Sequence, residues 1–221
     1  MNLAPEPLAL EPQSQPTQDC RRAIAFRYRG LFGAVLFVPV GLTVLFSAAV
    51  VPENSLQGVA LNAAGWLAFL IYAALRVWAT LYVGGRKDQE LQTEGPYSIC
   101  RNPLYLGSLA FAIAAACFLK SIVFAAALLP AVFLYLRFVV RAEEHYLERR
   151  FQADYRDYCR RTPRFWPRWS AFHTPSQVRV ELKRLKQEFL RLSRAAGFII
   201  VLQVIVHLRA GPSWPHWFSV P

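Results

Sequence analysis

Apolar residues occur in long runs along most of the chain, and short polar segments separate these runs. A bilayer core about 30 Å thick requires roughly 20 mostly apolar residues to cross it as a helix. The runs that approach or exceed this length before residue 141 are 31–51, 59–83, 104–119 and 122–140. Only Lys120 and Ser121 separate the last two runs, which predicts a tight helical hairpin. The pattern therefore predicts an all-α integral membrane protein.

The C-terminal region has a different pattern. Residues 195–208 form an apolar run of only about 14 residues, a length compatible with a short fifth span or with a helix in the headgroup region. The preceding stretch, 177–194, places leucines and one phenylalanine on one helical face and basic residues opposite them. Such a helix can lie on the membrane surface, or it can pack on the domain or on a second copy. We therefore expect four to five transmembrane helices.

Residues 141–161, RAEEHYLERRFQADYRDYCRR, follow a helical period instead of an apolar run. Leu147, Phe151, Tyr155 and Tyr158 recur at steps of four, four and three residues, which is typical of an amphipathic helix. This helix is expected to continue the fourth span into the cytosol. The prolines of the following PRFWPRW segment should end it.

Charge and composition refine this picture. The chain has 221 residues, 55% hydrophobic content and a formal charge of +11. The basic residues cluster beside the spans, so membrane orientation explains the charge better than nucleic-acid binding does. The positive-inside rule places the N-terminus and the segments 84–103 and 141–194 in the cytoplasm. The four cysteines and four histidines show no metal-ligand spacing, and we expect neither a metal site nor disulfides.

One polar segment, GPYSICRNPLYLG at residues 95–107, lies between two of the apolar runs. Irregular backbone near a membrane is tolerated where it is buried in protein or lines a polar cavity. The alternative is a simple helix-entry turn with Tyr and Arg as interfacial anchors. Glu143 and Glu144, just beyond the fourth span, can form a solvated face or, because the hairpin returns them to the same membrane side, contribute to that cavity.

The segment 95–107, the apolar hairpin and the sequence EEHYLERRFQADYRDYCRRTPRFWP together resemble the integral-membrane methyltransferases related to isoprenylcysteine carboxyl methyltransferase and phosphatidylethanolamine N-methyltransferase. The resemblance covers roughly residues 85–168 and combines many fixed spacings. It implies S-adenosylmethionine as methyl donor in a cytoplasm-facing pocket, and a lipid or lipid-like acceptor. The isoprenylcysteine enzymes usually have His where this chain has Asn102, which cannot titrate near neutral pH.

Position by position, the resemblance also implies the residues of the site. Glu143 is expected to receive the amino group of the cofactor, and Glu144 is a second candidate carboxylate. Glu144, Arg137 and Arg141 are candidates for a catalytic role, and Arg76 either faces the pocket or extends to the headgroups. The other implied cofactor contacts are Leu91, Gln92, Tyr97, Asn102, Pro103, Leu104 and Tyr105. The alternative function is that of a non-enzymatic membrane scaffold that retains this fold.

These interpretations divide the chain into four parts. Residues 1–20 are expected to be a disordered tail without a cleavable signal peptide, because they contain several prolines and lack a basic start and an apolar core. The other parts are the first two membrane helices (21–84), the methyltransferase signature with its hairpin (85–169), and a C-terminal amphipathic helix with the short apolar segment (170–221).

Overall fold

The computed structural model describes residues 40–47, 51–83, 90–211, 213–215 and 217. The expected tail at 1–20 and most of the expected first span at 31–51 lie outside these residues. The described residues form helices α2 (Leu56–Val83), α3 (Pro96–Ile99), α4 (Pro103–Leu119), α5 (Ile122–Tyr135), η1 (Leu136–Val140), α6 (Arg141–Arg161), η2 (Trp169–Ala171) and α7 (Leu182–Arg209).

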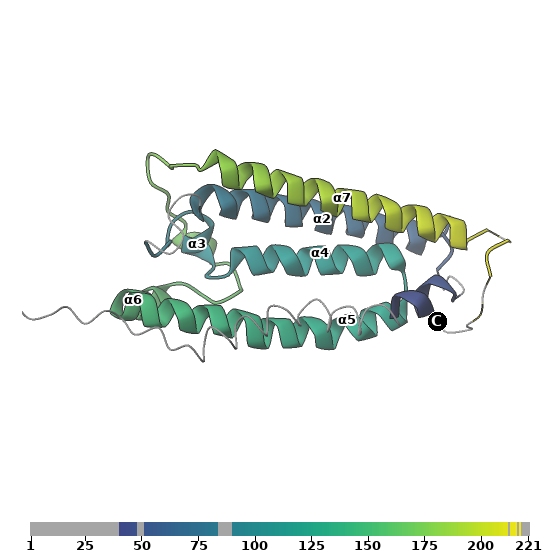
Figure 1. The fold of residues 1–221 in the computed structure, drawn as a ribbon, viewed down its shortest axis with the longest axis horizontal. Helices are drawn as coiled ribbons and strands as arrows, with labels where there is room; N and C mark the ends of the chain where they lie inside the picture. Colours follow the sequence, from purple (N-terminus) through teal and green to yellow (C-terminus); the bar gives the residue numbers. More distant parts are fainter. Residues whose placement is uncertain (1–39, 48–50, 84–89, 212, 216, 218–221) are drawn as a thin grey trace, which may run out of the picture. The chain divides into compact units, whose positions relative to one another are not determined.

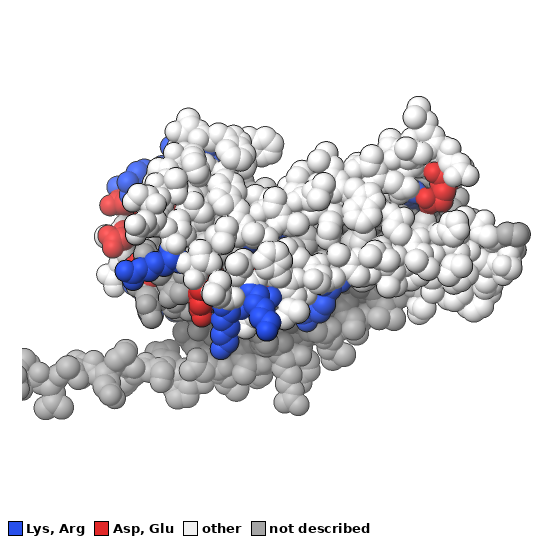
Figure 2. All heavy atoms as spheres, turned by 90° about the horizontal axis from the view of Figure 1, so that it is seen from above, with Lys and Arg blue, Asp and Glu red and all other residues white. Residues whose placement is uncertain are grey.

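Among the described residues, three helical stretches are long and apolar enough to cross a membrane: Leu56–Val83, Ile122–Arg161 and Leu182–Arg209. The helix Pro103–Leu119 is apolar but shorter. On the face shown in Figure 2, charged side chains gather mainly toward one end, one further group lies at the opposite end, and the surface between them is largely uncharged. Many large apolar side chains of α2, α5 and α7 are exposed, as lipid contact requires. The all-α membrane fold predicted from the sequence is confirmed.

Helices α2, α4 and α7 pack side by side (Figure 1). Their shared core consists of Ala68, Ala114, Phe118 and Ile199. A Cβ at Gly65 of α2 would lie 2.8 Å from the Phe118 ring, so only glycine leaves room for this aromatic side chain. Small residues at helix contacts are characteristic of membrane proteins, where close approach of backbones replaces the hydrophobic driving force.

The predicted hairpin between α4 and α5 is confirmed. Lys120 ends α4 in the left-handed conformation at φ 48°, and Ser121 caps α5 by accepting a hydrogen bond from the Phe124 amide at 3.3 Å. The Lys120 ammonium lies 2.6 Å from a carboxylate oxygen of Glu53, in the turn that precedes α2. This ion pair joins the two connections at one end of the helical layer.

Helix α7 joins two segments that the sequence pattern separates. The basic amphipathic stretch and the apolar run at 195–208 form one helix of 28 residues, long enough to cross a bilayer at about 1.5 Å per residue. It packs on α2 and α4, which favours packing on the domain over a position on the membrane surface. The two segments are separate in the sequence pattern because charged residues interrupt the apolar run. These charged residues do not interrupt the helix.

Helix α6 differs from the single amphipathic helix expected from its period. Its backbone breaks at Gln152, where φ is 42° and ψ is −109°. Beyond this break Tyr155 and Tyr158 are buried. The period of the apolar residues identified the buried positions, but it could not reveal the change in helix direction at Gln152.

Candidate functional site

The polar segment that opens at Gly95 is irregular because of its glycine and two prolines. Gly95 has φ 59°, and a Cβ there would lie 2.3 Å from the Tyr82 ring, so glycine is required both for the backbone conformation and for space. Pro96 begins the four-residue helix α3 and Pro103 begins α4, positions where a missing amide hydrogen costs nothing. The backbone of this segment therefore forms a helix-entry turn.

The loop after α6 holds this segment in place through the main chain. The Gly95 amide donates to the His173 carbonyl at 2.8 Å, and the Arg101 amide donates to the Pro163 carbonyl at 2.9 Å. In return, the Arg168 amide donates to the Ile99 carbonyl at 3.0 Å. Buried backbone donors and acceptors that the short helix cannot satisfy are thus paired, which explains how the irregular segment remains buried.

Two buried groups add to this scaffold. The Tyr158 hydroxyl donates to the Tyr97 carbonyl at 2.7 Å. Burial raises the pKa of Tyr97 well above the usual range and that of the Cys100 thiol to about 11. The Cys100 thiol donates to the carbonyls of Arg164 and Phe165. Tyr97 and Cys100 therefore stay uncharged near neutral pH.

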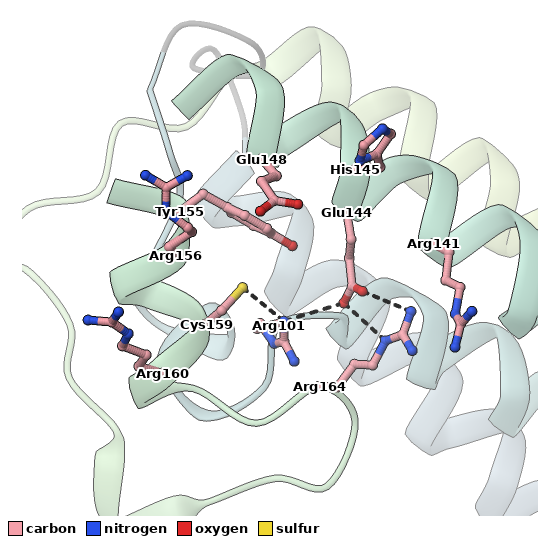
Figure 3. A pocket seen from close by; sticks show the side chains of 10 residues that line it. All are labelled: Arg101, Arg141, Glu144, His145, Glu148, Tyr155, Arg156, Cys159, Arg160 and Arg164. Carbon is pink, nitrogen blue, oxygen red and sulfur yellow. Dashed lines mark hydrogen bonds and ion pairs between the residues drawn. The ribbon is translucent and has the colours of Figure 1, made fainter. Parts of the chain in front are cut away.

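Asn102 and Glu144 meet across 42 residues of sequence. The Asn102 Nδ2 donates to Glu144 Oε1 at 2.9 Å and to the Arg164 carbonyl at 3.2 Å. Arg164 Nε and Nη2 lie 3.1 and 2.8 Å from the two carboxylate oxygens of Glu144, and Arg101 Nη1 lies 3.8 Å away (Figure 3). Glu144 is therefore a paired and largely buried carboxylate, not part of a solvated face.

Tyr105 and Glu143 form a second contact between the same two regions. The Tyr105 hydroxyl donates to Glu143 Oε2 across 38 residues of sequence. The Tyr105 ring lies edge-on to Tyr135 with centroids 5.7 Å apart. Glu143 itself is exposed, whereas Glu144 points toward the protein interior. The two adjacent glutamates thus occupy different surroundings, one open to solvent and one held by cations.

The other predicted site residues lie at varying distances from these contacts. Pro103 is buried and Leu104 half-buried in the first turn of α4. Leu91 lines a separate cavity of about 490 Å³ together with Tyr158, next to the half-buried Gln92. The structure brings Asn102 into contact with Glu144 and Tyr105 into contact with Glu143. Leu91 lines a different cavity.

The predicted arginines also separate into distinct surroundings. Arg141 lines a cavity of about 560 Å³ that Glu144 shares, whereas Arg137 is exposed within η1. Arg76 is not among the residues that line this cavity. Its guanidinium binds both carboxylate oxygens of Glu188 on α7, at 2.6 and 2.9 Å.

Sequence reasoning missed two partners of the site. Arg164, in the PRFWP segment, is the main cation on Glu144, and Cys159 accepts a hydrogen bond from Arg101 Nη1 at 2.9 Å. In the sequence, the two prolines of this segment indicate a turn, but they do not indicate where the side chain of Arg164 points. The pairing of Arg101 with a carboxylate, in contrast, is expected from the chemistry of its guanidinium group.

Chemically, this arrangement can hold a cationic, polar ligand. An exposed carboxylate at Glu143 offers a partner for an ammonium group, and the rings of Tyr105 and Tyr135 beside it offer faces for a cation. Asn102 fixes Glu144 in place and retains its amide oxygen as an acceptor. The donor set therefore suits an organic cation.

Comparisons of the sequence with known proteins find similar proteins. A family model described as phospholipid methyltransferase matches residues 54–154. The chain is 35% identical over 162 residues to the nickel-cobalt-cadmium resistance protein NccN of Alcaligenes xylosoxydans xylosoxydans, covering 73% of this chain and 76% of that protein. It is 32% identical over 139 residues to the cobalt-zinc-cadmium resistance protein CzcN of Cupriavidus metallidurans, with 63% and 64% coverage. No solved structure matches the chain. The chain belongs to the phospholipid methyltransferase family.

Proposed function

We propose that this protein transfers a methyl group from S-adenosylmethionine to a lipid or lipid-like acceptor at the cytoplasmic membrane face. One observation carries the proposal. The α4–α5 hairpin returns Glu143 and Glu144 to the residues that open α4, so that each glutamate contacts one residue of the family motif, Tyr105 or Asn102. Two polar sequences that are far apart along the chain thus form one site at the end of an apolar helical layer.

The charges and hydrogen-bonding groups of these residues support the proposed cofactor. S-adenosylmethionine supplies an electrophilic methyl group on a sulfonium. Glu143 would hold its ammonium group, and Tyr97 and Tyr105 would line the site around the cation. Asn102 and Arg164 would hold the Glu144 carboxylate in its orientation. Because methyl transfer is an in-line displacement, the main tasks of these residues are alignment and exclusion of water.

The acceptor would enter from the bilayer, next to the apolar faces of α4 and α5. A carboxylate acceptor needs no base, whereas an ammonium acceptor must first lose a proton. Glu144 is the candidate base for the second case, and Arg141 is the candidate partner for an anionic acceptor. The proposed lipid-like acceptor follows from the position of the site at the end of the apolar helices.

A second candidate is a non-enzymatic membrane scaffold with this fold. The observation that favours it is that the two relatives are named for resistance to metals and not for methylation. Cofactor binding separates the two functions, because a scaffold has no need of S-adenosylmethionine.

The test is isothermal titration of detergent-purified protein with S-adenosylhomocysteine. The wild type should bind, and Glu143→Ala should reduce binding below detection while leaving the melting temperature nearly unchanged, since Glu143 is exposed. Glu148→Ala, which removes an exposed carboxylate from the same half of α6, is the matched control and should bind like the wild type. Failure of the wild type to bind, or equal affinity in Glu143→Ala, would remove the support for an enzyme with this site.

A further inference from the structure

A cavity of about 560 Å³ beside Glu144 has an unusual charge. Its lining contains five arginines and two glutamates, an excess of three positive charges. The arginines are Arg101, Arg141, Arg156, Arg160 and Arg164. They come from the segment before α4, from both halves of α6 and from the loop that follows it (Figure 3).

The break at Gln152 creates this arrangement. In a straight helix, Arg141 and Arg160 would lie about 28 Å apart along the axis, at 1.5 Å per residue. With the break, Arg141 and His145 in the first half of α6 and Arg156 and Arg160 in the second half line the same cavity. Gln152 adopts a positive φ that is unfavourable for a residue with a side chain, so the folded backbone is maintained against its own local preference.

The arginines of the cavity divide into paired and unpaired groups. Arg164 and Arg101 are engaged with Glu144, and Arg101 also with Cys159. Arg160 has only an exposed contact with Asp157 at 3.3 Å, a type of pair that contributes little. Within the described part of the chain, the side chains of Arg141 and Arg156 have neither a hydrogen-bond nor an ion-pair partner.

We propose that this cavity binds a phosphate group. Like charges converging on one cavity repel each other, and an anion that neutralises them removes this cost. A phosphate presents several acceptor oxygens at once and can bind more than one guanidinium fork, which suits donors that approach from two directions. The phosphate can belong to a lipid headgroup or to a soluble phosphate ester. Glu144 and Arg141, which the proposed function uses, also line this cavity, so the inference rests in part on that function and extends it with a phosphate-binding role for Arg156 and Arg160.

The test compares two probes in isothermal titrations of the full-length protein in detergent. Dihexanoyl phosphatidic acid represents the lipid source and glycerol 3-phosphate the soluble source; dihexanoylglycerol, which lacks phosphate, is the negative probe. The test variant is Arg156→Gln/Arg160→Gln, two exposed arginines of the cavity. The matched control is Arg149→Gln/Lys186→Gln, which removes the same charge from exposed positions outside the cavity.

We expect the wild type to bind a phosphate probe and not dihexanoylglycerol. The cavity variant should lose roughly 5-fold in affinity for each arginine, or about 30-fold in total, and the control should stay within about 2-fold. Binding of both probes assigns the site to the phosphate group alone, and binding of the lipid only assigns it to a headgroup. No binding of either probe, or equal losses in both variants, would overturn the proposal. Titration with S-adenosylhomocysteine on the same variants keeps this result separate from the proposed methyl transfer, because Glu143, the proposed partner of the cofactor's ammonium group, is not among the residues that line the cavity.

Discussion

The ion pair between Arg76 and Glu188 provides the sharpest test of how α7 is held. The two side chains are 13% and 4% exposed, and two nitrogen–oxygen contacts of 2.6 and 2.9 Å join them. Glu188→Ala leaves Arg76 buried without its carboxylate. Breaking a buried pair in this way costs about 3–5 kcal/mol. For a chain of this size, that corresponds to a fall in melting temperature of roughly 6–20 °C.

The neighbouring arginine supplies a matched control. Arg191 also contacts Glu188, but its side chain is 52% exposed. Such an exposed pair contributes at most about 1 kcal/mol, so Arg191→Ala should change stability little. The double variant Arg76→Met/Glu188→Leu should recover most of the loss, because replacing a buried pair with apolar residues of similar volume is often nearly neutral.

Stability can be measured by unfolding in mixed micelles with increasing SDS, followed by tryptophan fluorescence. We expect the order wild type, Arg191→Ala and the double variant within about 1 kcal/mol of each other, with Glu188→Ala well below them. If Glu188→Ala is as stable as Arg191→Ala, the two side chains do not form a buried pair and the packing of α7 on α2 is different from that described here.

Three further predictions concern the site, the break in α6 and the orientation of the chain. Asn102→Leu removes the amide that holds Glu144, so it should weaken S-adenosylhomocysteine binding by about 5–150-fold, a penalty on the order of 1–3 kcal/mol. Asn102→His should retain most of the affinity. Unchanged binding by the leucine variant in these titrations would contradict the role of Asn102. Gln152→Gly should raise the free energy of unfolding by about 1 kcal/mol by removing an unfavourable backbone conformation, whereas a loss in SDS unfolding experiments would argue against the positive φ. In a cysteine-free background, an impermeant maleimide should label Ser55→Cys from outside and Gln92→Cys only from the cytoplasm; labelling of residue 92 from outside would exclude the proposed cytoplasmic site.

Sequence patterns predicted part of the candidate site. The fixed spacings of the motif singled out Asn102, Tyr105, Glu143 and Glu144, and the structure brings these residues into contact. Their roles toward a cofactor remain predictions. The spacing of the motif could not reveal that Glu144 is held by cations and Glu143 exposed, because adjacent residues on a helix point in directions about 100° apart and their surroundings depend on what packs there.

The partners of the long-range charges could not be derived from the sequence. Arg76 and Glu188 are 112 residues apart, and neither position has a local pattern that names the other. Their pairing depends on the register of α7 against α2, which is set by packing of the small and apolar residues between the two helices.

By itself, the sequence predicted the all-α membrane fold, the position of the hairpin turn and the motif that identifies the family. Apolar run length and fixed spacing are local properties, and the bilayer requires internally hydrogen-bonded helices wherever such runs occur. Only the tertiary structure decided that α7 is one continuous helix, that α6 breaks at Gln152 and that five arginines line one cavity. These features arise from contacts between residues far apart in the chain, whose free energies outweigh local propensity at the positions where they compete.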